Sequence, residues 1–139
     1  MLAAAGGPNV HPHASSPAAK RAVWDRDVAK WKNDFAGLQG FMLDVAHDRA
    51  GPDEEVTRRG FTFISTDSIP QGAFYTVGWT MGATIERELG RAALVGAMCD
   101  RPALLRLYNR AAMRVNRRGR DRLPLWSDEL LRLVSPARG

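Results

Sequence analysis

The chain contains a single cysteine, Cys99, which excludes an internal disulfide bond and a zinc site built from several cysteines. Because Cys99 follows an apolar stretch, residues 94–98, we expect a buried, unreactive thiol rather than a nucleophile. Histidine is also scarce: His11 and His13 lie near the start, and His47 stands alone. The sequence has no His-Glu-x-x-His, no phosphate-binding loop and no Gly-x-Ser-x-Gly. The residues alone therefore show no complete active site, and no cofactor or metal site is expected in this chain.

Long apolar runs are missing as well, because no stretch approaches the roughly 20 residues needed to cross a bilayer. A length of 139 residues suits one domain or part of one, and 45% hydrophobic with 25% charged residues suits a compact soluble core. Residues 1–19 are dominated by small residues, proline and glycine, so we expect a disordered lead-in. This segment lacks the basic start and apolar block of a signal peptide, and the localisation stays open. Residues 136–139 are expected to form a tail.

The spacing of large apolar residues predicts an all-α, mostly α-helical fold over residues 20–135. The strongest signal is a run of seven residues separated by steps of four and three, which predicts one helix over residues 18–48. We call these seven residues the apolar stripe: Trp24, Val28, Trp31, Phe35, Leu38, Met42 and Val45. Gly37 and Gly40 favour a bend in this helix, and polar residues between the stripe positions, such as Asp34, are expected to meet water.

Four further helices are expected, over residues 73–89, 91–98, 101–115 and 128–134. Asp100 and Ser127 are predicted as N-caps, and Gly90 is predicted to end a helix in a left-handed conformation. Between the first two helical regions, Asp53 begins a short helical turn, residues 61–64 are expected to be extended, and residues 67–72 form a loop. Residues 116–122 are predicted as a polar loop, after which residues 123–126 pack onto the domain.

Charge is concentrated near the end of the chain. Residues 101–122 hold eight arginines and one acid, Asp121, whereas the whole chain has a net charge of only +5. Arg106, Arg110, Arg114 and Arg117 share one face of the expected helix over residues 101–115 and its end, which suits phosphate binding. A coding sequence rich in G and C would produce the same arginine bias without a functional cause, and we favour a solvated face over a nucleic-acid site.

Three stretches carry a resemblance that covers most of residues 24–130. One is the tryptophan-rich helix at the start, and another runs from Cys99 to Asn109 with Asp100, Leu104 and Tyr108. The third contains Tyr75-Thr-Val-Gly78 at a helix start after a Gly/Pro loop, followed by Ile85-Glu86 and Leu89-Gly90-Arg91. Together they resemble the C-terminal helical part of a family of zinc-dependent peptidases related to the gluzincin metallopeptidases.

The resemblance implies a peptide substrate and a catalytic zinc in the intact family member. Its zinc-binding His-Glu-x-x-His helix and a third ligand, a glutamate, precede the part that this chain resembles. Tyr75 matches a tyrosine that donates its hydroxyl to the oxyanion, and Gly78 would let the substrate or the zinc-bearing helix approach the backbone. Because this chain has no zinc-binding motif, we expect it to be inactive alone, as part of a longer enzyme or as a decayed form.

Two other functions stay open at this point. The apolar stripe could pair with another chain, which would make the protein a stand-alone helical interaction module. The arginine-rich face could bind nucleic acid, although few aromatic residues accompany it and no nucleic-acid-binding motif occurs. We therefore expect one of two partners: the missing N-terminal catalytic half of a longer enzyme, or another helical chain that pairs with the apolar stripe.

Overall fold

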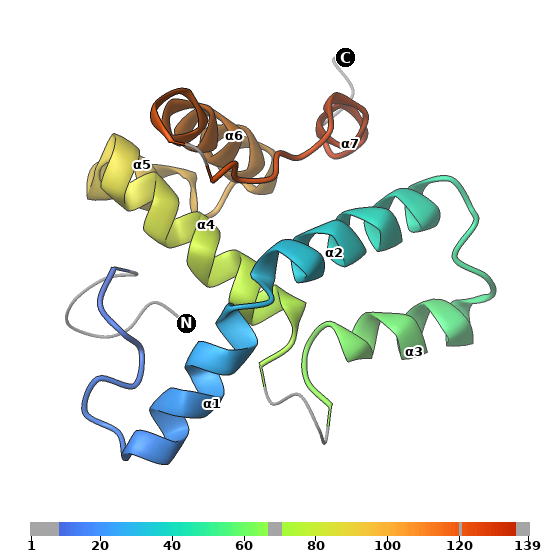
Figure 1. Ribbon diagram of the computed structural model, residues 1–139. Coiled ribbons are helices and arrows are strands. Elements are labelled where there is room, and N and C mark those ends of the chain that lie inside the picture. Colours follow the sequence, from blue (N-terminus) through green and yellow to red (C-terminus); the bar gives the residue numbers. More distant parts are fainter. Residues whose placement is uncertain (1–8, 67–70, 120, 136–139) are drawn as a thin grey trace. The chain divides into compact units, whose positions relative to one another are not determined.

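The computed structural model describes residues 9–66, 71–119 and 121–135, and within them the regular secondary structure is entirely helical (Figure 1). The helices in chain order are α1 (Ala18–Val28), α2 (Trp31–Ala46), α3 (Asp53–Thr62), α4 (Ala73–Leu89), α5 (Arg91–Ala97), α6 (Arg101–Arg118) and α7 (Asp128–Leu133). The all-α prediction is confirmed. The predictions for residues 1–8, for most of the loop at 67–72 and for the tail at 136–139 fall outside the described residues.

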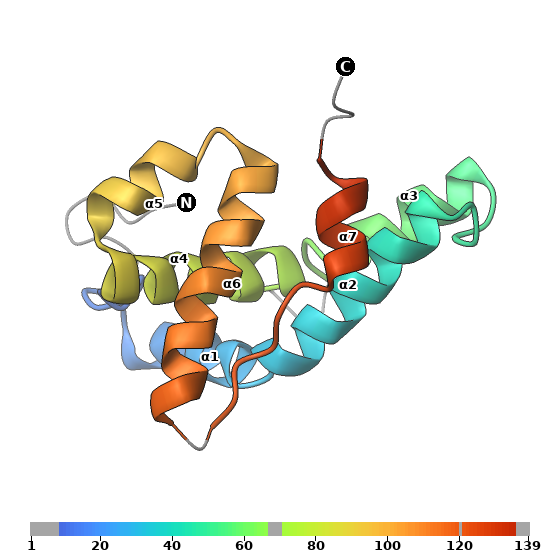
Figure 2. The same ribbon diagram turned by 90° about the horizontal axis from the view of Figure 1, so that it is seen from above.

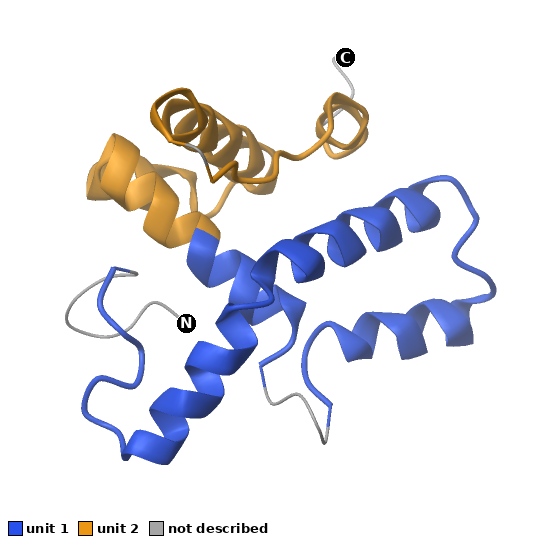
Figure 3. Cartoon of the chain, viewed as in Figure 1, with its two compact units in different colours: residues 1–80 blue, residues 81–139 orange. Residues whose placement is uncertain are grey.

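The chain divides into two compact units, residues 1–80 and 81–139 (Figure 3). The first unit contains α1, α2, α3 and the beginning of α4. The second unit contains the rest of α4 together with α5, α6 and α7, and in it α6 packs against both α5 and α7.

The prediction of one helix over residues 18–48 is wrong, because Ala29 and Lys30 separate α1 from α2. Lys30 has φ −93° and ψ 3°, and its N–H reaches back to Asp27 O instead of continuing the regular helical ladder. Neither residue is a helix breaker. The break accompanies burial of the Asp27 side chain, which receives a hydrogen bond from the distant Gln71 N–H. Both glycines expected to cause a bend, Gly37 and Gly40, lie inside α2.

The extended segment predicted at residues 61–64 is also wrong. Helix α3 runs through Phe61 to Thr62, and Phe63 keeps a right-handed helical conformation as its C-cap. Three acidic residues in the first turn, Asp53, Glu54 and Glu55, favour this helix start through the helix dipole. The predicted turn at Asp53 is therefore the start of a full helix.

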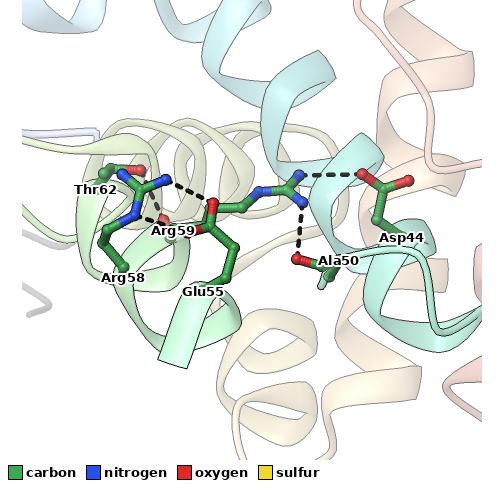
Figure 4. A network of polar contacts seen from close by, with 6 residues as sticks. All are labelled: Asp44, Ala50, Glu55, Arg58, Arg59 and Thr62. Atoms are coloured by element: carbon green, nitrogen blue, oxygen red, sulfur yellow. Dashed lines mark hydrogen bonds and ion pairs between the residues drawn. The ribbon is translucent and has the colours of Figure 1, made fainter. Parts of the chain in front are cut away.

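Helices α2 and α3 are tied together by one arginine (Figure 4). Arg59 donates a hydrogen bond to Asp44 Oδ2 at 3.0 Å and another to the carbonyl oxygen of Ala50 at 3.3 Å. Its guanidinium also lies 5.2 Å from the centre of the Phe41 ring, within the range of a cation–π contact. Arg59 thus closes the α2–α3 hairpin, whereas its neighbour Arg58 bonds Glu55 within α3.

The predicted caps in the second half of the chain are confirmed. Asp100 accepts a hydrogen bond from the Ala103 N–H at the start of α6, and Ser127 accepts one from the Leu130 N–H at the start of α7. Gly90 has φ 89° between α4 and α5, a conformation that favours glycine. Each capping side chain bonds an N–H group only three residues later, so these caps can be predicted from the sequence.

The prediction of a buried thiol is wrong, because Cys99 is exposed. The apolar residues before it do not form a closed cluster. Val95 and Met98 are 60% and 44% exposed, and the short helix α5 turns only Leu94 and Ala97 inward. Cys99 follows α5 on the exposed side of this turn.

Candidate functional site

The Tyr75-x-x-Gly78 motif lies in the first turn of α4. Gly72, just before this turn, fixes the close contact between the start of α4 and the end of α3. The Gly72 N–H donates to Ile64 O at 2.9 Å, and the Phe74 N–H donates to Phe63 O at the same distance. A Cβ atom at Gly72 would lie 2.5 Å from both of these carbonyl oxygens. Only glycine fits this approach, which sets where α4 begins relative to the end of α3.

Two carboxylates from α1 and α2 hold the same turn. The Asp27 side chain is fully buried and accepts a hydrogen bond from the Gln71 N–H at 3.3 Å, and Arg26 Nη2 lies 2.8 Å from its Oδ1. Asp34 Oδ2 accepts a 2.6 Å hydrogen bond from the hydroxyl of Thr76, which is itself buried. The contacts join residues 42 and 44 positions apart in sequence.

Asp34 was expected to meet water, and the structure assigns it to this contact instead. Sequence reasoning also missed Asp27 and Thr76. The signal for Asp27 was present, because it lies three residues after Trp24 and four before Trp31, on the same helical face as the apolar stripe. An acid on that face needs a buried partner, and here the partner is the main chain that leads into α4.

Tyr75 lies on the opposite, open side of the first turn. Its neighbours Thr76 and Val77 are buried, whereas Tyr75 is 40% exposed and Gly78 is exposed. A Cβ at Gly78 would have no atom within 4 Å. Because residues three apart share a helix face, Tyr75 and Gly78 form one accessible surface. Within the described residues, no neighbouring element packs onto Gly78.

The hydroxyl of Tyr75 has no hydrogen-bond partner among the described residues, so it is available to a ligand oxygen. A phenol can donate one hydrogen bond and accept others. Beside it, Phe74 is 49% exposed and its ring packs edge-on against Phe63, with centroids 6.3 Å apart. The turn thus presents a polar donor next to apolar surface on a backbone that is fixed from behind.

Zinc has no assembled ligand set in residues 9–66, 71–119 and 121–135, where no three His, Cys, Asp or Glu side chains gather closely enough. His11 Nε2 lies 3.0 Å from Asp25 Oδ1, and the His13 ring packs edge-on against Trp24 at 5.8 Å. These two histidines therefore connect residues 11–16 to α1. The described residues do not by themselves fit a catalytic zinc.

Several arginines of α6 have structural partners. Arg114 donates to the carbonyl oxygen of Glu88 at the end of α4 at 2.9 Å, and Arg118 pairs with the Glu88 carboxylate, which is only 8% exposed. Arg106 bonds the hydroxyl of Ser135 after α7. Arginines near helix C-termini satisfy carbonyl groups that the helix leaves free. Three of the arginines thus stabilise the second unit, and no observation favours a nucleic-acid site.

The apolar stripe is buried in part. Trp24, Phe35 and Leu38 are each at most 5% exposed, whereas Val45 is 43% exposed and the other three stripe residues are half-buried. The buried part of the stripe belongs to the core of the first unit rather than to a surface open to another helix. Within the described part of the chain, no helix has both the length and the apolar character to cross a bilayer.

Comparisons with known proteins give one family. No curated protein and no solved structure matches the chain. A family model described as "Putative zinc dependent peptidase (DUF5700)" matches residues 8–117, which include α1 to α5 and nearly all of α6. Because this match covers most of the sequence, the chain belongs to that family of zinc-dependent peptidases.

Proposed function

We propose that this chain is the C-terminal helical portion of a gluzincin-like, zinc-dependent peptidase, and that Tyr75 donates a hydrogen bond to the substrate during peptide hydrolysis. The family description supports a peptide substrate and a dependence on zinc. The observation that carries the role of Tyr75 is its exposed hydroxyl on a helix turn that Gly72, Asp27 and Asp34 hold from behind.

The chemistry needs such a donor. Attack on a peptide carbonyl places negative charge on its oxygen, and a donor already in position stabilises that charge without having to reorganise. The buried contacts of Gln71 and Thr76 restrain the backbone on either side of Tyr75. Gly78, one turn later, leaves room for a substrate main chain along the same face.

The zinc ligands in this proposal come from a His-Glu-x-x-His segment outside this chain. The described residues contribute binding surface and the Tyr75 hydroxyl. We therefore expect purified 1–139 to hold no stoichiometric zinc and to show no chelator-sensitive peptidase activity. Stoichiometric zinc together with such activity would overturn this part of the proposal.

The role of Tyr75 is tested in a protein that joins this sequence to the zinc-binding segment. DNA upstream of Met1 is the place to look for that segment, and its absence would favour a stand-alone helical module. In the joined protein, Tyr75→Phe should lower kcat about 100- to 1,000-fold, as for other oxyanion donors, with zinc content unchanged.

The matched control is Phe61→Leu, which changes an exposed aromatic side chain on α3, outside this turn, and leaves the Tyr75 hydroxyl in place. We expect this control to keep kcat close to that of the wild type. Equal kcat values for Tyr75→Phe and the wild type would show that the hydroxyl does not act on the reacting carbonyl.

A further inference from the structure

Helix α6 binds the main chain of residues 123–126, which follow it in the sequence. Asn109 Oδ1 accepts a hydrogen bond from the Trp126 N–H at 2.9 Å, and its Nδ2 donates to Trp126 O at 2.8 Å. Asn116 makes the same pair with Leu123, with distances of 2.7 Å from the N–H and 3.0 Å to the carbonyl oxygen. Each asparagine thus satisfies both backbone groups of one residue, as a neighbouring β-strand would.

The two asparagines have the spacing that an extended peptide requires. They are seven residues apart on α6, which corresponds to a rise of about 10.5 Å along a helix. Leu123 and Trp126 are three residues apart, which corresponds to about 10 Å in an extended chain. The repeat of the helix and that of the peptide therefore match, with the peptide antiparallel to α6 (Figure 2).

Pro124 lies between the two residues that the asparagines bind, and its backbone is also bound by α6. The buried hydroxyl of Tyr108 donates to Pro124 O at 2.9 Å. Because proline has no N–H, Pro124 needs no hydrogen-bond acceptor on α6 in addition. The Leu125 side chain is 38% exposed, whereas Trp126 is 2% exposed. Recognition is thus carried by five main-chain hydrogen bonds and by one buried side chain at the end of the segment.

We propose that Tyr108, Asn109 and Asn116 form a binding site for the main chain of an extended peptide, and that residues 123–126 are its tethered ligand. The site reads backbone groups, so it accepts a peptide whose intervening side chains differ, provided that an apolar residue occupies the Trp126 position. This site lies in the second unit and is independent of the role proposed for Tyr75.

The experiment separates the ligand from the site after the whole chain has folded. A cleavage site for a specific protease is inserted after Gly119, and the purified chain is cut once its helical circular dichroism matches that of the wild type. A fluorescent synthetic peptide of residues 121–135 is then added, and its exchange into the cut chain is followed by anisotropy. We expect saturable exchange with the helical signal retained.

Backbone recognition is tested with ester-containing peptides, in which an oxygen replaces one amide N–H. Esters at Leu123 or Trp126 should each weaken binding about 3- to 10-fold, since each removes one hydrogen bond. The matched control is an ester at Arg122, whose N–H has no acceptor among the described residues. A peptide with Leu125→Ala should bind within about threefold of the parent peptide, because that side chain is largely solvated.

The proposal is overturned if the labelled peptide does not exchange into the cut chain, whether or not the chain keeps its helices. It is also overturned if the Leu123 and Trp126 esters bind as the Arg122 ester does. A second measurement needs no insertion: in the intact chain, Asn116→Ala should increase hydrogen exchange at the Leu123 amide while the Trp126 amide stays protected. Equal exposure of both amides would show that the segment is not held residue by residue.

Discussion

The hydroxyl of Thr76 donates a 2.6 Å hydrogen bond to Asp34, and this contact attaches the first turn of α4 to α2. Thr76 is completely buried, so replacing it with valine would leave the carboxylate without this donor while keeping the side-chain shape. A hydrogen bond to a charged group contributes about 1.5–3 kcal/mol.

We therefore expect Thr76→Val to lower the free energy of unfolding by about 1.5–3 kcal/mol, measured by urea denaturation with circular dichroism. Thr57→Val is the matched control, because Thr57 is exposed on α3 and should change the value by less than about 0.5 kcal/mol. Similar values for the two variants would mean that the Thr76–Asp34 contact does not hold α4.

Arg59 and Arg58 are adjacent on α3 but have different partners. Arg59→Met removes the bonds to Asp44 and Ala50 and should lower the free energy of unfolding by about 1–2 kcal/mol. Arg58→Met removes only contacts to Glu55 at the surface, and we expect a smaller loss. The hydrogen bonds from Arg58 lower the pKa of Glu55, and the charge of Arg59 lowers it further by a smaller effect. In an NMR titration of that carboxyl, Arg58→Met should therefore raise the pKa of Glu55 more than Arg59→Met does. An equal loss of stability in both variants would contradict the role of Arg59 as the link between α2 and α3.

Arg118 and Arg110, both on α6, should also differ in how much they stabilise the fold. Arg118→Met removes the partner of the nearly buried Glu88 carboxylate, and we expect a loss of about 1 kcal/mol in the free energy of unfolding at low salt. Arg110→Met is the control, because Arg110 is exposed and has no partner among the described residues. Nucleic-acid affinity that falls steeply with salt and decreases in Arg110→Met would instead support a phosphate-binding face.

Tyr108 should make the fold sensitive to alkali. Burial raises the pKa of its hydroxyl above the ordinary value of 10.0. Above about pH 10 the unfolded chain loses this proton while the folded chain keeps it. The unfolded state then binds fewer protons, and the free energy of unfolding falls as the pH rises.

The measurement uses Tyr75→Phe, in which Tyr108 is the remaining tyrosine. We expect tyrosinate absorbance to appear only as the helical circular dichroism is lost. In urea, the same variant should titrate near the ordinary value of about 10. Tyrosinate that forms while the helices persist would contradict the burial of this hydroxyl.

Cys99 should react in the folded protein. Because its side chain is exposed, we expect iodoacetamide to modify it without denaturant at a rate close to that of the unfolded chain. Cys99→Ser provides the unlabelled control in mass spectrometry. Protection that is released only by urea would restore the buried thiol that the sequence pattern predicts.

Local signals allowed much of the fold to be predicted. Apolar spacing indicated α4, α5, α6 and α7 to within a few residues, and Asp100 and Ser127 cap the helices predicted for them. The same spacing failed at Ala29–Lys30, because the apolar pattern continues through these residues although the helix does not. It failed again at Phe61, where an aromatic run suggested a strand although the residues continue α3.

The candidate site was predictable only in part. Tyr75 was singled out by the family resemblance, which depends on the Tyr-x-x-Gly at a helix start, and its role stays a prediction. The groups that fix it were not found, because Asp27 meets Gln71 and Asp34 meets Thr76 across more than 40 residues. The spacing of apolar residues predicts which face of a helix is buried, but not which turn of another helix it contacts.

The residue pattern is enough to predict where helices form and which of their faces are apolar, because helical period and capping act over three or four residues. Which polar groups are paired depends on how the helices and loops pack. Asn109 and Asn116 look like ordinary surface residues in the sequence, and only the return of residues 123–126 along α6 gives them four backbone partners. Long-range contacts of this kind satisfy buried backbone groups, and their partners are set by the path of the chain rather than by neighbouring residues.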